Sequence, residues 1–78
     1  MNSNNYDWHA KSKQVKETYG LRYRPDILSN RTAAFEWANG MRKLHLVILG
    51  DDCKFWVVCP ADASRLIKAG YEICSIKE

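Results

Sequence analysis

The chain has 78 residues, of which 46% are hydrophobic and 12% are aromatic, and its formal net charge is +3. This length allows one domain, and the apolar fraction is too high for a disordered protein. The chain has no apolar run near the roughly 20 residues that span a bilayer, and its Asn-rich start lacks a signal-type segment. We therefore expect a cytoplasmic protein without membrane association.

The basic excess lies in the first part of the sequence. Residues 1–31 hold six Lys or Arg and three acidic residues, whereas residues 32–78 hold six of each. This asymmetry predicts a basic lead-in over residues 1–24, followed by a single small α+β domain over residues 25–78.

Within the lead-in, four residues follow the spacing of one helix face: Trp8, Ser12, Val15 and Tyr19. Asp7 is suited to cap this helix and Gly20 to end it. Residues 21–24 then alternate in polarity, and Pro25 interrupts the pattern.

The strongest local signal of the domain is the dipeptide Asn39-Gly40. Both residues tolerate the positive φ that a two-residue type I′ hairpin turn requires. If the strands on either side pair about this turn, Glu36 lies opposite Lys43, which is a favourable cross-strand contact. We therefore expect a first hairpin over residues 33–46.

A helix over residues 31–39 is the alternative. Asn30 would cap it and Gly40 would end it. Its apolar spacing is poorer, however, and it gives the Glu36–Lys43 pair no role, so we favour the hairpin.

A second hairpin is expected from the strand-like runs 44–49 and 54–59. Placing Leu49 opposite Lys54 brings Ile48 to Phe55, and the apolar face of the first hairpin then continues without conflict. The two hairpins together predict a three-stranded antiparallel meander.

A helix and a short last strand follow the meander. Pro60 ends the third strand and suits the start of a helix over residues 61–69, and Gly70 suits its end. Residues 71–76 form the last strand. If this strand joins the sheet parallel to the third strand, the crossover through the helix should be right-handed. The predicted fold is therefore α+β, with the order β-β-β-α-β after the lead-in.

One face of this predicted sheet would carry an apolar cluster of Trp56, Val47 and Val58, which the helix on the opposite face cannot cover. A patch of this kind is typical of a contact surface. The lead-in helix, a second copy of the chain or a foreign protein could cover it. The candidate protein-binding residues are Trp56, Val47, Val58, His45, Trp8 and Tyr19.

Nucleic acid is the alternative partner, because aromatic and basic residues alternate in the lead-in. Aromatic rings can stack on bases while cations follow the phosphates. The candidate nucleic-acid-binding residues are Lys11, Lys13, Lys16, Arg22, Arg24 and Tyr23.

Catalytic and metal-binding patterns are missing from the sequence. His45 has no nucleophile with an orienting acid beside it, and Asp51-Asp52 is typical of a solvated turn. Three cysteines without CxxC spacing predict free thiols. We therefore expect no enzyme, no catalytic residue, no metal, no cofactor and no small-molecule substrate.

The segments FWVVCPADA (residues 55–63), RL (65–66) and AGYE (69–72) carry a resemblance. Over roughly residues 33–73 the chain is similar to the ends of short uncharacterised proteins encoded on proteobacterial phages, plasmids and integrative elements. The resemblance implies binding and modulation of host machinery, defence systems included. The expected function is a small non-enzymatic protein-binding module, an inhibitor or accessory factor from a mobile element, with weak nucleic-acid binding as the alternative.

Overall fold

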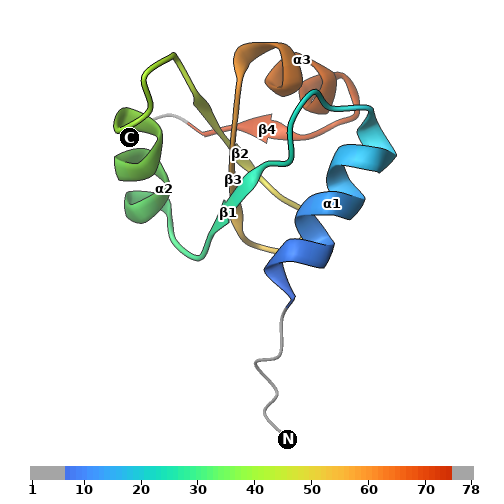
Figure 1. The fold of residues 1–78 in the computed structure, drawn as a ribbon, viewed down its shortest axis with the longest axis horizontal. Coiled ribbons are helices and arrows are strands. Elements are labelled where there is room, and N and C mark those ends of the chain that lie inside the picture. The colour runs from blue at the N-terminus through green and yellow to red at the C-terminus, as the bar shows by residue number, and fades with distance from the viewer. Residues whose placement is uncertain (1–6, 75–78) are drawn as a thin grey trace, which may run out of the picture.

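The computed structural model describes residues 7–74. Its elements in chain order are α1 (Trp8–Tyr19), β1 (Asp26–Leu28), α2 (Arg31–Asn39), β2 (Leu46–Leu49), β3 (Phe55–Val58), α3 (Pro60–Lys68) and β4 (Glu72–Ile73) (Figure 1). The strands form one sheet in the order β1-β3-β2-β4, and all neighbouring pairs are antiparallel. The α+β class is confirmed, whereas the predicted order β-β-β-α-β is wrong.

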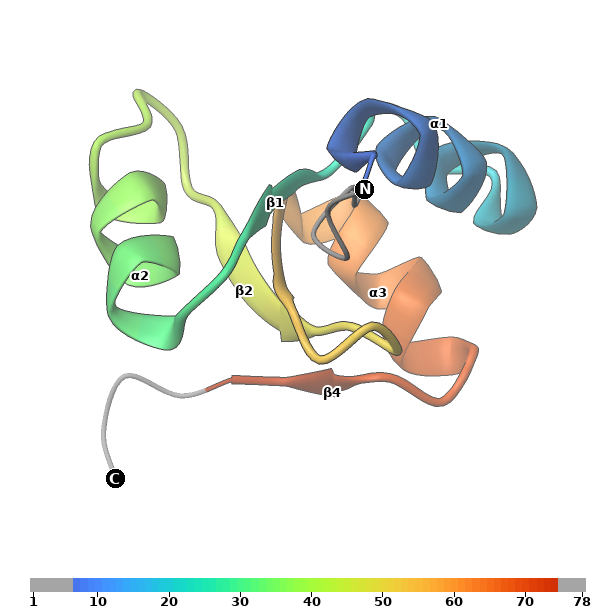
Figure 2. The same cartoon turned by 90° about the horizontal axis from the view of Figure 1, so that it is seen from below.

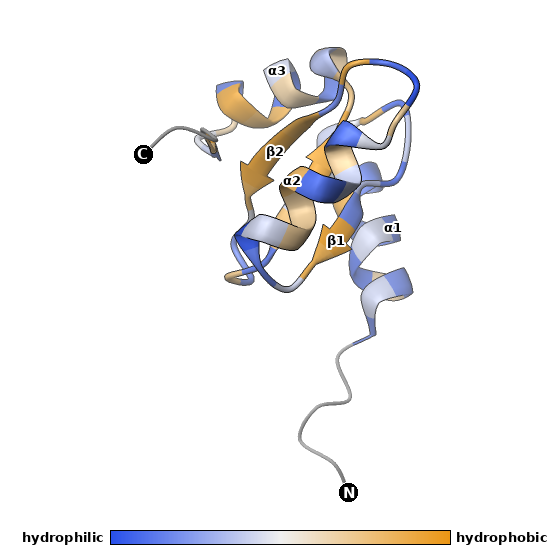
Figure 3. Cartoon of the chain, turned by 90° about the vertical axis from the view of Figure 1, so that its left-hand side faces the viewer, coloured by the Kyte–Doolittle hydropathy of each residue, from blue (hydrophilic) through white to orange (hydrophobic). Residues whose placement is uncertain are grey.

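The sheet lies between two helical layers, with α2 on one face and α1 and α3 on the other (Figure 2). One core packs Ile48, Trp56 and Val58 of the sheet against residues of α1 and α3. The second core packs Val47 and Val57 against Ala34 and Ala38 of α2. Strands β1 and β2 are accordingly hydrophobic, whereas α1 is mostly hydrophilic (Figure 3). Covering both faces leaves the two sheet edges as the places where a strand can still be added.

Helix α1 forms as the sequence predicts. The side chain of Asp7 accepts a hydrogen bond from the backbone N–H of Ala10 at 3.0 Å, which satisfies one of the free donors of the first turn. Gly20 ends the helix with φ 64°, a left-handed conformation that favours glycine. Val15 is buried against the sheet, so the helix is part of the packed fold. In the described part of the chain, no helix has the length and apolar character needed to cross a membrane.

Residues 31–39 form helix α2, so the predicted first hairpin is wrong and the alternative is correct. The side chain of Asn30 accepts a hydrogen bond from the N–H of Ala33 at 2.8 Å, which caps the helix. Gly40 closes the helix at φ −82°, so the dipeptide Asn39-Gly40 does not use positive φ. Ala34 and Ala38, four positions apart, bring the helix backbone close to the sheet.

The hairpin of β2 and β3 is present, but its register differs from the prediction by one residue. Ile48 lies opposite Trp56, and Gly50 donates its N–H to the carbonyl of Lys54 at 2.9 Å. The turn between them has three residues, and its last residue, Cys53, takes φ 62°. Because successive side chains alternate between faces, this shift moves every side chain of β3 to the opposite face from the predicted one.

Helix α3 agrees with the sequence prediction, whereas strands β4 and β1 differ from it. Helix α3 is confirmed, with bounds that differ by one residue from the predicted range 61–69, and it carries Asp62 in its first turn. The last strand, β4, is shorter than expected and pairs antiparallel with β2, not parallel with β3. Strand β1, directly after Pro25, was not predicted, and it occupies the outer position beside β3.

Candidate functional site

The apolar patch expected on the outer sheet face is not a surface. Trp56, Val47 and Val58 are 0%, 1% and 3% exposed. They also belong to different layers, because Trp56 and Val58 pack towards α1 and α3 whereas Val47 packs towards α2. The prediction that these three residues form one exposed contact face is therefore wrong, and the reason is the three-residue turn together with helix α2.

The other candidate protein-binding residues lie at the two ends of α1 and before β2. His45 precedes β2, and its Nδ1 lies 3.0 Å from the carbonyl oxygen of Lys43. Tyr19 packs edge-on against Tyr71, with ring centroids 5.4 Å apart. Trp8, at the start of α1, is 38% exposed.

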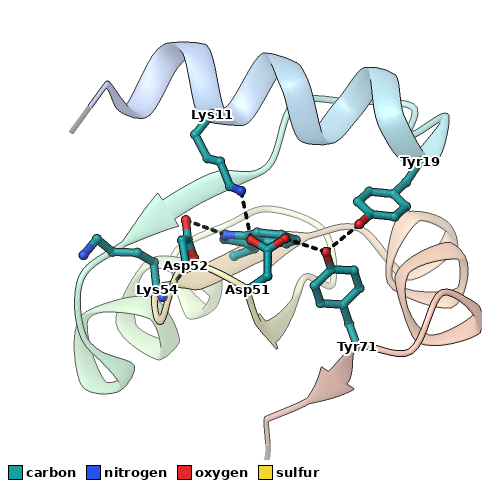
Figure 4. Close-up of polar contacts among 7 residues, drawn as sticks. Lys11, Tyr19, Asp51, Asp52, Lys54 and Tyr71 are labelled. Carbon is teal, nitrogen blue, oxygen red and sulfur yellow. Dashed lines mark hydrogen bonds and ion pairs between the residues drawn. The ribbon is translucent and has the colours of Figure 1, made fainter.

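A chain of hydrogen bonds joins α1, the β2–β3 turn and the residue before β4 (Figure 4). Asp51 accepts hydrogen bonds from Lys11 Nζ at 2.9 Å and from the hydroxyl of Tyr71 at 3.0 Å. The Tyr71 hydroxyl has one proton and gives it to Asp51, so the Tyr19 hydroxyl, 2.6 Å away, is the donor to Tyr71. These contacts fix the turn to elements distant in sequence.

The same chain shifts two pKa values. The hydrogen bond from Lys11 lowers the pKa of Asp51 because it stabilises the carboxylate. Burial raises the pKa of Tyr71, and the hydrogen bond that its hydroxyl donates to Asp51 adds to this effect. Since every polar atom in the chain of contacts has a structural partner, we assign it to stability.

A pocket of about 450 Å³ opens at the β1 edge of the sheet. It is called the edge pocket here, and it is lined by Trp8, His9 and Ser12 of α1, Arg24 and Pro25 of the following connection, all three residues of β1, and Trp37 of α2. Helices from the two layers thus form its walls, with β1 between them (Figure 2). Concave sites with aromatic walls and a few polar groups are the usual form of a binding site.

Two exposed indoles stand at this pocket. Trp37 is 52% exposed, and its Nε1–H donates to Asp26 Oδ2 at 2.9 Å, which ties α2 to β1. The ammonium of Lys54 lies 5.7 Å from the ring centroid of Trp8. Arg24 makes no hydrogen bond or ion pair with any other residue of the described range. The pocket therefore offers apolar area together with an unpaired cation.

Strand β1 also turns an unused pair of backbone groups towards the pocket. Gly50 and Lys54 form a hydrogen-bonded pair between β2 and β3. Hydrogen-bonded and non-hydrogen-bonded pairs alternate along an antiparallel ladder, so the pair Ile48–Trp56, two positions further on, is hydrogen-bonded as well. Trp56 therefore directs its N–H and C=O to β2. Trp56 is also the residue opposite Ile27, so Ile27 cannot bond to β3 and directs its own N–H and C=O outwards.

Pro25, two positions before Ile27 in the chain, supports this orientation. The carbonyl oxygen of Pro25 also points outwards, where it accepts the hydroxyl proton of Ser12 at 2.6 Å. No residue between 7 and 74 bonds to the outward groups of Ile27. The edge pocket therefore has an open position for one strand residue.

The candidate nucleic-acid residues are divided among different environments. Lys11 is bound to Asp51 and Lys16 is half-buried, whereas Lys13, Arg22, Tyr23 and Arg24 are exposed. The backbone N–H groups of Arg22 and Tyr23 donate to the fully buried carboxylate of Asp62, at 2.8 and 3.2 Å. Of the six candidates, Arg24 alone lines the edge pocket.

Ser12 and His9 both line the edge pocket. Ser12 directs its proton to Pro25, and no hydrogen bond joins it to His9. No group of three or more His, Cys, Asp or Glu within residues 7–74 has an arrangement that could hold a metal ion. The three cysteines are free thiols, as predicted, and burial raises the pKa of the Cys74 thiol.

Trp8 and Arg24 are thus the sequence candidates that the structure brings into one site. Trp37, Asp26 and Ile27 were missed. A signal for β1 was present, because Pro25 stands directly before a short segment that contains Ile27 and Leu28, and a proline in this position is typical of an edge strand. Searches of family models, curated proteins and solved structures find no match for this chain.

Proposed function

We propose that the chain is a small non-enzymatic protein-binding module whose contact site is the edge pocket. The observation that carries the proposal is the position of two exposed tryptophans, Trp8 and Trp37, on either side of an unpaired sheet edge. Tryptophan is enriched among the residues that dominate binding energy at protein interfaces.

We further propose that the partner belongs to the machinery of a bacterial host and that the chain acts on it as an inhibitor or accessory factor. The support for this step is the similarity of residues 33–73 to short proteins of mobile elements. The edge pocket supports protein binding as such and is independent of that similarity.

The test is a comparative pull-down from a bacterial lysate with quantitative mass spectrometry. Wild type, Trp37→Ser and Leu44→Ser serve as baits. Leu44 is a matched control because it is an exposed hydrophobic residue, 68% accessible, that does not line the pocket. We expect a protein that is captured by wild type and by Leu44→Ser and lost with Trp37→Ser.

Circular dichroism must show that both variants keep the fold. Equal capture by all three baits would contradict the proposal, since the pocket would then contribute nothing to binding.

A second candidate function is weak binding of single-stranded nucleic acid. The supporting observation is that Arg24 lies in the same pocket as the two indoles, so a base could stack while the guanidinium meets a phosphate. Titration with oligothymidylate at several salt concentrations tests this function. A steep fall in affinity with salt, and weaker binding by Arg24→Ala, would support it.

A further inference from the structure

We infer that the partner presents an extended segment that adds to the sheet as a new strand beside β1, hydrogen-bonded to Ile27. This inference rests on the proposed protein-binding function and specifies its mode. Strand addition requires an edge with free backbone groups and pockets for alternate side chains. The edge pocket has both.

The backbone requirement is met at one residue. Ile27 directs its N–H and its C=O away from β3, and no described residue bonds to either group. A partner residue in an antiparallel pair could satisfy both groups at once, because such pairs exchange two N–H···O bonds. The flanking Pro25 has no N–H, and its carbonyl is already bonded to Ser12, so pairing is confined to a short segment.

The two walls of the pocket assign the partner's side chains to different surroundings. Ile27 packs with the core under α1 and α3, so a partner residue directly opposite it would point to the same side, where α1 contributes Trp8. The residues before and after it would point to the other side, where Trp37 of α2 lies. Strand pairing thus aligns successive partner side chains with the two indoles in turn.

The charges of the pocket indicate the chemistry of the segment. Asp26 accepts the indole N–H of Trp37 and keeps its negative charge, whereas the Arg24 guanidinium has no hydrogen bond or ion pair with another described residue. Arg24 is therefore the position at which an acidic residue of an extended segment would pair, beside apolar side chains that meet the indoles. A nucleic acid strand could use Arg24 and the indoles, but it has no peptide groups to pair with Ile27, so the protein segment is the occupant that uses all the features.

The experiment begins with a phage-displayed library of random dodecapeptides, selected on wild type and counter-selected on Trp37→Ser. The best peptide is then synthesised in a series in which one backbone amide at a time is N-methylated. We expect the loss of affinity to be confined to one position, with about a tenfold loss at the amide that pairs with Ile27 and small changes at its neighbours. Binding through side chains alone gives no such single-position loss.

Two variants of the protein test the hydrogen bonds between Ile27 and the peptide. Ile27→Pro removes the outward N–H, whereas Ile27→Val keeps the backbone and an apolar side chain. We expect the selected peptide to bind roughly tenfold more weakly to Ile27→Pro and within about threefold of wild type to Ile27→Val. If Ile27→Pro does not fold, the N-methyl series still decides the question.

The outcomes separate this inference from the function on which it depends. Peptides that need Trp37 but lose no affinity at any single N-methylated amide would overturn strand addition and leave protein binding in place. If no peptide prefers wild type to Trp37→Ser, both fail. Retention of oligothymidylate in the absence of any peptide would favour the nucleic acid. A dimer mass in light scattering that Ile27→Pro reduces to the monomer would make a second copy the occupant and overturn the inference.

Discussion

Gly50 lies directly against the indole ring of Trp56. A Cβ placed on Gly50 would fall 2.3 Å from Cε2 of the ring and 2.5 Å from Nε1. Trp56 is fully buried, and its ring packs on Tyr71 with centroids 5.2 Å apart, so it has no free space to move into. The close approach of the turn to the core therefore depends on the absence of a side chain at this position.

Gly50→Ala is expected to destabilise the protein by about 1–3 kcal/mol, because the added methyl group overpacks the core. Urea unfolding followed by tryptophan fluorescence measures the change. Gly40→Ala is the matched control, since a Cβ there would lie 3.5 Å from its nearest neighbour and φ is −82°. Equal unfolding midpoints for the two variants would contradict the account of Gly50.

Asp62→Ala is expected to cost about 2–4 kcal/mol, because it leaves two backbone N–H groups without their buried acceptor. The carboxylate of Asp62 is 0% exposed and holds the connection after α1 through Arg22 and Tyr23. Thermal unfolding by circular dichroism gives the measurement. Ser64→Ala, at an exposed position of the same helix, should change little. A loss no larger than that of the control would show that the connection is held by other contacts.

Asp51→Asn should lower stability at neutral pH by less than about 1 kcal/mol, since Asp51 is half-exposed and solvent screens its ion pair with Lys11. The folded protein lowers the pKa of Asp51, so the ionised carboxylate stabilises the fold above its ordinary value of about 3.9. This contribution is lost as the pH falls through the folded pKa. The gap between wild type and Asp51→Asn should therefore close in acid.

Lys11→Met provides the partner for a double-mutant cycle with Asp51→Asn. The two changes should be less than additive at pH 7, because either one removes the ion pair between Lys11 and Asp51. Full additivity would mean that the contact contributes nothing to folding.

Tyr71→Phe should destabilise the protein, and the difference from wild type should depend on pH in the alkaline range. The folded protein raises the pKa of Tyr71, so the protonated hydroxyl contributes fully below its unfolded value of about 10. This stability is lost as the pH rises through the folded value. Tyrosinate absorbance should accordingly show one late-titrating group that Tyr71→Phe removes, and its presence in the variant would refute the assignment.

Local signals predicted the elements whose ends are set by their own residues. Asp7 and Gly20 bound α1, and Pro60 begins α3, because caps and proline act within one turn. The dipeptide Asn39-Gly40 led to the wrong prediction of a hairpin, because the packing of Ala34 and Ala38 on the sheet outweighs the turn preference of the dipeptide.

The register of β3 could not be obtained from apolar alternation alone. One extra turn residue, Cys53 at positive φ, decides which face Trp56 occupies. The edge pocket could not be predicted from the sequence for a related reason. It joins Trp8, Ile27 and Trp37 from three elements, and β1 has three residues, too few to show a period.

The strand order has a practical consequence for labelling and immobilisation. Helix α1 begins beside the edge pocket, whereas β4 forms the opposite border of the sheet. An affinity tag or fluorophore joined ahead of α1 would enter the space in which a ligand must approach. Attachment behind β4 would leave that approach free, so baits and biosensor surfaces should carry the protein by its carboxyl-terminal side.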